Sequence, residues 1–262
     1  MNQLRYYFRL ALATPFIPYL YRQANQIMEN MPDFPAPTDI LKKGDKENFR
    51  LLGIGESSIA SIGVDTQKDG LTGKLAAMIE EKHGLSVSYE VVAKSGYTAA
   101  QVRDELLPQM QSTEADLVII GLGANDSFQI SKPKKWKQDL VDIIAHVRKN
   151  FGKVPIVFIN TPPMEELPAL GRLLRFFLNR QMSLLRDELY KVTRNQKGLY
   201  FIKKKLTCRA LAGKYKLKYD SISDFYSDGV HPSKLTYNLW AKEIFEFIQE
   251  KNLTFVARPG VS

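Results

Sequence analysis

The chain has 262 residues, and its 37 lysines and arginines exceed its 28 acidic residues, so the formal net charge is +9. Hydrophobic residues make up 44% and charged residues 25%, which excludes a disordered chain, a collagen-like repeat and a coiled-coil rod. The single cysteine, Cys208, excludes an intramolecular disulfide and a cysteine-rich metal site.

The excess of basic residues permits contact with nucleic acid, an anionic membrane or an acidic substrate. The densest basic clusters lie at 132–137, 203–205 and 214–218. None of them has the glycine and aromatic pattern of an RNA-recognition motif, and the chain has no zinc-finger spacing. The sequence therefore favours a solvated basic surface and no nucleic-acid partner, with attraction to an anionic lipid or substrate as the alternative.

Residues 1–20 contain two arginines and an apolar run that two prolines interrupt, and no acidic residue precedes Glu29. The run is too short to cross a bilayer as a helix, which needs about 20 apolar residues. Three interpretations remain: an amphipathic segment in peripheral contact with a membrane, an arm packed on the domain, or an atypical signal or anchor. The Pro-rich segment 31–37 predicts a linker, so we expect an arm and linker over 1–48 and one domain over 49–262.

In the core, short apolar runs alternate with segments of helical periodicity. Strands are predicted at 50–55, 86–93, 116–123, 154–160 and 199–202. Helices are predicted at 71–82, after the N-cap residue Thr98, and at 136–151, about 167–196 and 234–251. This alternation predicts a parallel sheet with helices on both faces, whose active site lies beyond the carboxyl ends of the strands.

The loops after these strands contain the groups that acyl transfer requires. Ser57 follows the first strand, and a serine hydroxyl needs a base to take its proton. His231 is suited to that task, and Asp228, three residues earlier, can orient the imidazole from a tight turn or one helical turn. An oxyanion formed at Ser57 would meet the N–H groups of Ser57 and Gly96 and the side chain of Asn125. The other histidines, His83 and His146, have no such neighbours and are expected to be structural.

Four short blocks carry a family resemblance. They are Gly55-Glu56-Ser57, Gly96, Gly123-Ala124-Asn125-Asp126 and Asp228-Gly229-Val230-His231. In this order they resemble the SGNH (GDSL-like) hydrolase superfamily over roughly residues 49–250. The resemblance implies a flavodoxin-like three-layer α/β/α sandwich with a five-stranded parallel sheet, and esterase or lipase activity without metal or cofactor. It also implies that Ser57 is the nucleophile, that Gly96 and Asn125 are oxyanion donors, and that Asp228 and His231 are the acid and base of a triad.

One residue departs from the family pattern, because Glu56 stands where an aspartate is usual. That side chain is normally structural, so a longer carboxylate is expected to affect efficiency more than reaction type. We therefore expect a serine esterase whose substrate is a small acyl ester or a lysophospholipid. The alternatives are a carbohydrate O-acetyl esterase and a catalytically inactive binding protein on the same fold.

Two further expectations concern the role of one long segment and the location of the protein in the cell. The segment from Leu167 to Tyr190 interleaves leucines, Phe176 and Phe177 with arginines. It is either a core helix with snorkelling arginines or a flap over an acyl pocket. The lone cysteine is compatible with a reducing compartment, so we expect a cytoplasmic protein, with membrane association as an option and an exported or periplasmic protein as the alternative.

Overall fold

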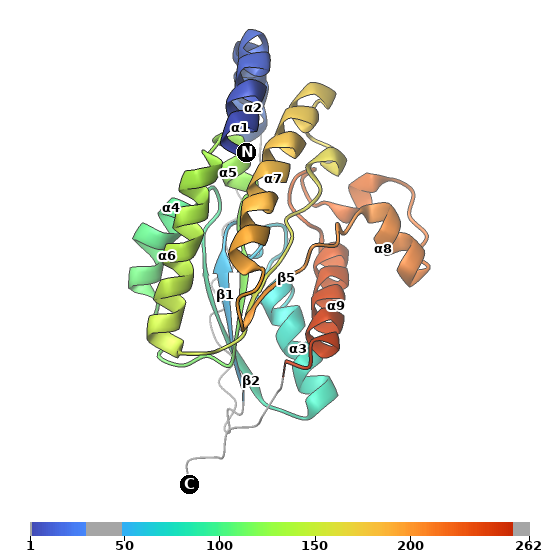
Figure 1. Ribbon diagram of the computed structural model, residues 1–262. Helices are drawn as coiled ribbons and strands as arrows, with labels where there is room; N and C mark the ends of the chain where they lie inside the picture. The colour runs from blue at the N-terminus through green and yellow to red at the C-terminus, as the bar shows by residue number, and fades with distance from the viewer. Residues whose placement is uncertain (1, 30–48, 254–262) are drawn as a thin grey trace.

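The computed structural model describes residues 2–29 and 49–253, and Figure 1 shows how their elements are arranged. Within these residues, five strands form one parallel sheet in the order β2-β1-β3-β4-β5. They are β1 (Phe49–Gly55), β2 (Val87–Ala93), β3 (Leu117–Gly121), β4 (Ile156–Phe158) and β5 (Leu199–Phe201). The predicted α/β fold with a five-stranded parallel sheet is confirmed. The chain passes from β1 to β2 on one side and then to β3 on the other, so the topological switch point lies between β1 and β3.

The longer helices lie where the sequence predicts them. They are α3 (Leu71–His83), α6 (Pro133–Phe151), α7 (Arg172–Thr193) and α9 (Lys234–Glu250). The chain leaves α3 at Gly84, which has a left-handed φ of 64° as expected of a glycine stop. The start of α7 is later than predicted because Leu167 precedes a proline and is extended.

The helix predicted after Thr98 is interrupted. Thr98 caps it as expected, and its hydroxyl accepts the N–H of Gln101. Only α4 (Ala99–Gln101) is α-helical, because a π-helical turn and then a 3-10 turn containing Pro108 follow it. Two short helices, α5 (Ala124–Phe128) and α8 (Cys208–Tyr215), are not predicted, since a short helix shows little of the 3.6-residue period.

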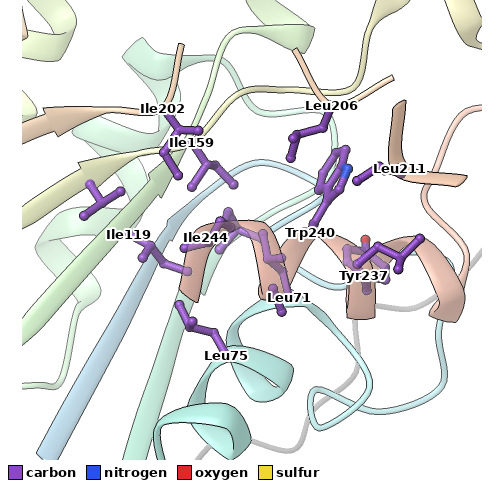
Figure 2. Close-up of a cluster of buried hydrophobic side chains, with 14 of the residues drawn as sticks. Leu71, Leu75, Ile119, Ile159, Ile202, Leu206, Leu211, Tyr237, Trp240 and Ile244 are labelled. Atoms are coloured by element: carbon purple, nitrogen blue, oxygen red, sulfur yellow. The ribbon is translucent and has the colours of Figure 1, made fainter. Parts of the chain in front are cut away.

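Side chains alternate between the two faces of the sheet. Ile119 of β3 belongs to the cluster that includes α3 and α9, whereas the next residue, Ile120, belongs to the cluster that includes α6. Figure 2 shows side chains of the first cluster, among them Ile119 of β3, Leu71 of α3 and Ile244 of α9. Burial on both faces explains why the central strands are almost continuously apolar.

The amino-terminal segment forms two helices, α1 (Asn2–Ala13) and α2 (Ile17–Glu29), joined by the 3-10 turn Thr14–Phe16. We call α1, this turn and α2 the N-terminal hairpin. Pro15 and Pro18 lie in the first turns of their helical segments, where a missing N–H costs no hydrogen bond. This explains why two prolines interrupt the apolar run without preventing a helical structure.

The N-terminal hairpin contacts the domain next to α5 and the first half of α7, as Figure 1 shows. Tyr6 is 5% exposed and donates a hydrogen bond to the carbonyl of Ile130, at 3.0 Å. Arg9 donates to the carbonyl of Arg180 on α7, at 2.7 Å. None of the helices in the described ranges has the length and hydropathy needed to span a bilayer. The linker predicted at 31–37 lies outside the described residues, and the division at residue 48 stays a prediction.

Candidate active site

Ser57 lies just beyond the carboxyl end of β1, in a tight turn. The N–H groups of Ile59 and Ala60 both bond to the carbonyl of Glu56, and the N–H of Ile62 bonds to the carbonyl of Ser57. Ser57 is partly exposed, whereas its neighbours Glu56 and Ser58 are buried. The turn thus presents one hydroxyl to the surface at the switch point of the sheet.

Asp228 and His231 meet as the sequence predicts. Oδ2 of Asp228 lies 2.6 Å from Nδ1 of His231. Oδ1 accepts the backbone N–H groups of Val230 at 2.9 Å and His231 at 2.7 Å. Burial opposes ionisation of Asp228, but these hydrogen bonds outweigh it and hold the pKa of the carboxyl below its usual range. An ionised carboxylate needs a donor, so Nδ1 carries the proton and Nε2 is left as the basic nitrogen.

The turn that holds Asp228 and His231 packs against the segment after Ser57. The hydroxyl of Tyr237, at the start of α9, donates to the carbonyl of Ile62 at 2.7 Å. A Cβ on Gly63 would stand 2.4 Å from the hydroxyl oxygen of Ser227, so glycine is required for this close approach. Among the described residues no hydrogen bond joins Ser57 to His231. Catalytic hydrogen bonds are often completed only when substrate binds.

The loops after β2 and β3 also meet. The side-chain amide of Asn125 donates to the carbonyl of Tyr97 at 3.1 Å, which places Asn125 beside the loop that contains Gly96. The side chain of Asn125 also interacts with the carboxyl of Glu56, where it opposes the rise in the pKa of that group. Gly96 has a φ of 81°, a backbone conformation that favours glycine, and nothing lies within 4 Å of the place a Cβ would take.

Two buried carboxyls, whose partners the sequence analysis does not predict, hold these loops together. Glu56 accepts the N–H groups of Ala124 at 2.8 Å and Asn125 at 2.9 Å, so it caps the start of α5. Asp126 accepts the N–H of Ala99 at 2.9 Å and thereby joins α5 to α4. Burial raises the pKa of Asp126. The glutamate at position 56, where the family usually has an aspartate, therefore has a structural role. Its longer side chain reaches the amino end of α5.

Burial raises the pKa of Glu56 to about 8, although its two N–H partners act in the opposite direction. Between its ordinary value of 4.5 and about 8, the folded protein holds one proton more than the unfolded chain at this position. The free energy of unfolding therefore loses about 1.4 kcal/mol per pH unit from this group as the pH rises through that window.

Glu56→Gln removes this titration, so we expect its stability relative to wild type to improve steadily from about pH 5 to about pH 8. Urea unfolding of both proteins across that range measures the difference, and groups common to both cancel. Glu81→Gln, at an exposed position on α3, is the matched control for replacing a glutamate by glutamine. A pH-independent difference for Glu56→Gln would contradict the raised pKa.

The other candidate functional groups, His83 and Cys208, belong to helices α3 and α8 rather than to the loops that hold the candidate triad. Nε2 of His83 is 2.9 Å from the side-chain amide of Gln249, between α3 and α9. Cys208 is buried, and burial raises the pKa of its thiol to about 12. Across residues 2–29 and 49–253, no three side chains of His, Cys, Asp or Glu are grouped as a metal site would need.

A model of the GDSL-like lipase/acylhydrolase family matches residues 54–239, which is most of the chain. The chain belongs to the GDSL-like lipase/acylhydrolase family. The superfamily resemblance predicted from the four blocks is thereby confirmed. Esterase TesA of Pseudomonas aeruginosa is 30% identical over 115 residues, which are 43% of this chain and 55% of the relative. The match thus spans little more than half of that relative's length.

Solved structures share the fold of this chain at low sequence identity. The lipase Lip_vut3 from a goat rumen metagenome is 17% identical with a TM-score of 0.56, over 75% of this chain and 95% of the lipase. Axe2, an acetylxylan esterase from Geobacillus stearothermophilus, is 15% identical with a TM-score of 0.53, over 82% of this chain and 99% of the esterase. At these identities the likeness concerns the fold alone.

Proposed function

We propose that this GDSL-like protein is a serine hydrolase of carboxylic esters, with Ser57 as nucleophile, His231 as base and Asp228 as the orienting acid. The hydrogen bond of 2.6 Å between Asp228 and His231, in a turn packed on the segment after Ser57, carries the proposal. A buried carboxylate on Nδ1 leaves Nε2 as the nitrogen that can take a proton.

In the first half of the reaction, Oγ of Ser57 attacks the ester carbonyl carbon while Nε2 of His231 takes the hydroxyl proton. The carbonyl π electrons move to oxygen, and the oxyanion is met by the N–H groups of Ser57 and Gly96 and the amide of Asn125. The intermediate collapses, the bond to the alcohol oxygen breaks, and His231 returns the proton to the leaving alcohol.

In the second half, His231 takes a proton from water, and the hydroxide oxygen attacks the acyl-enzyme carbonyl. The second tetrahedral intermediate releases the carboxylic acid and restores the Ser57 hydroxyl with the proton from His231. Asp228 stays ionised throughout and stabilises the imidazolium, which agrees with the lowered pKa of its carboxyl. Hydrolysis of p-nitrophenyl acetate by the purified protein, compared with Ser57→Ala, tests the proposal, and we expect activity only in the wild type.

A carbohydrate O-acetyl esterase is the second candidate, because this fold also occurs in Axe2, an acetylxylan esterase, and is therefore compatible with that activity. Acetate release from acetylated xylan, with no hydrolysis of long-chain esters, would distinguish this activity from cleavage of a lysophospholipid. An inactive binding protein would release no product from any of these substrates and would leave Ser57 unmodified by a fluorophosphonate.

We also propose that the outer face of the N-terminal hairpin contacts an anionic membrane surface. Leu4 and Phe8, one turn apart on α1, are 76% and 64% exposed, and Tyr21 on α2 is 68% exposed. The exposed Arg5 and Arg22 accompany them, and the hairpin has no acidic residue before Glu29. Exposed aromatic and apolar side chains beside arginines are typical of segments that lie in a membrane interface.

Phe8→Ser is expected to weaken binding to phosphatidylglycerol vesicles by roughly ten-fold, because a large apolar side chain no longer enters the lipid. Cosedimentation with these vesicles measures the change, and phosphatidylcholine vesicles should bind less protein. Tyr219→Ser alters an exposed aromatic residue outside the N-terminal hairpin and should bind as the wild type does. Equal binding by Phe8→Ser and wild type would rule out this contact.

A further inference from the structure

An apolar cavity of about 470 Å³ lies between the N-terminal hairpin, α5 and α7. Its walls include Leu10 and Ile17 from the hairpin, Phe128 from α5, and Leu174 and Phe177 from α7. A volume of this size is within the range of about 300–1,000 Å³ that is usual for ligand sites, which are mostly apolar. The hairpin thus closes a space over α7 that neither element would form alone.

A second hollow, of about 600 Å³, adjoins the first and is basic. Arg9 and Arg180 line both spaces, and Arg186, Lys203 and Lys205 line the second. Asp187 is the acidic residue among the described residues that line it. The two spaces together therefore have an apolar part and a cationic part, with two guanidinium groups at the boundary.

Few acidic side chains oppose the cations that line the basic hollow. Within residues 2–29 and 49–253, Arg9, Arg180 and Lys203 form no salt bridge with an acidic side chain. Burial, together with the neighbouring guanidinium groups of Arg180 and Arg5, lowers the pKa of Arg9 against the opposing effect of Asp187. Placing an anion between these groups would relieve their mutual repulsion, so the charge of the hollow is complementary to an acidic headgroup.

Helix α5 contains both a proposed active-site residue and residues that line the apolar cavity. Asn125, the proposed oxyanion donor, is in the first turn of α5, and Ser127 and Phe128 of the same helix line the cavity. Three residues along an α-helix rise only about 4.5 Å. Met182 of α7, which lines the basic hollow, accepts a hydrogen bond from Thr161, just after β4. Both spaces thus lie against residues at the carboxyl end of the sheet.

We infer that the N-terminal hairpin and α7 form the binding site for the long acyl chain of an anionic single-chain ester, with the acidic headgroup held in the basic hollow. The inference rests on the proposed function and narrows its substrates to acidic lysolipid-like esters. It also assigns Phe176 and Phe177, which line the cavity, to an acyl pocket.

Ala24 of α2 lines the cavity and leaves room for a larger side chain, so Ala24→Trp should occupy part of the space. The kcat/KM for p-nitrophenyl palmitate, divided by that for p-nitrophenyl acetate, is expected to fall roughly ten-fold, as when about two methylenes lose their apolar contacts. Leu173→Trp fills the same cavity from α7 and replaces Ala24→Trp in this test if that variant does not fold. Ala11→Trp, at an exposed position of α1, is the matched control and should leave the ratio unchanged.

Binding gives a readout that does not depend on catalysis. We expect Ala24→Trp to bind 1-palmitoyl-lysophosphatidylglycerol roughly ten-fold more weakly, and Arg180→Gln to weaken binding of this anionic lipid more than that of 1-palmitoyl-lysophosphatidylcholine. Arg194→Gln, exposed at the end of α7, is the control for charge. If esters are cleaved at Ser57 but neither the ratio nor the binding responds to cavity filling, the site is overturned and the proposed function stands. If no ester is cleaved but binding responds, the lipid site stands without the proposed function.

Discussion

Ser57→Ala is expected to lower kcat for p-nitrophenyl acetate by about 10⁶, the loss seen when a triad nucleophile is removed. Without the hydroxyl no acyl-enzyme can form, and what remains is hydrolysis assisted only by the oxyanion donors. A fluorophosphonate should modify the wild type at Ser57 and leave the variant unmodified, which would identify Ser57 as the reactive hydroxyl.

Ser58→Ala is the matched control, since it removes the adjacent hydroxyl from the same turn. Ser58 is 5% exposed, so its hydroxyl is not presented to substrate, and we expect kcat to stay within about ten-fold of wild type. Loss of activity in Ser58→Ala with retention in Ser57→Ala would show that the nucleophile is misassigned. Equal activity in all three proteins would contradict the serine mechanism.

Asp228→Asn is expected to lower kcat by about 10⁴, as in other triads where the acid becomes an amide. The remaining oxygen can still accept the N–H groups of Val230 and His231, so the turn should persist. The amide nitrogen, however, donates towards Nδ1 and forces the proton onto Nε2, which can then no longer accept the proton of Ser57.

The kcat and the thermal stability of Asp228→Asn together test the prediction that Asp228 orients His231. Thermal unfolding of Asp228→Asn should show a folded protein, and its activity should fall far more than its stability does. Asp220→Asn, exposed at the start of the same loop, provides the charge-matched control and should keep wild-type kcat. An Asp228→Asn variant that keeps more than about a tenth of wild-type activity would mean that His231 is not oriented by this carboxylate.

Much of the fold is predictable from the sequence because its signals are local. The apolar run of β3 and the glycine after α3 determine their structure within a few residues. The helix after Thr98 shows the limit of prediction from local sequence. Its N-cap is a local signal and is predicted, whereas its π-helical turn is set by packing in the folded domain. The start of α7 is misplaced because apolar periodicity extends back through Pro168, which the backbone does not follow.

The contacts of the candidate site also fall into those that residue spacing predicts and those that it does not. Asp228 and His231 are three residues apart, so their contact can be expected from spacing. The bond from Ala124 to Glu56 joins residues 68 positions apart, and nothing in the sequence near Glu56 indicates that partner. The apolar cavity depends on contact between residues near the amino terminus and α7, so amphipathic patterns indicate its two walls but not that they face each other.

The bonds of Glu56 have a mechanical consequence. Glu56 and Ser57 are joined by one peptide unit, and Glu56 is bonded to the backbone of Asn125. A displacement of the end of β1 therefore carries the hydroxyl of Ser57 and the amide of Asn125 in the same direction. The distance between Ser57 and Asn125 should therefore change little when the sheet is distorted. Mutations that shift the end of β1 should change the position of His231 relative to Ser57 before they change the position of Asn125 relative to Ser57.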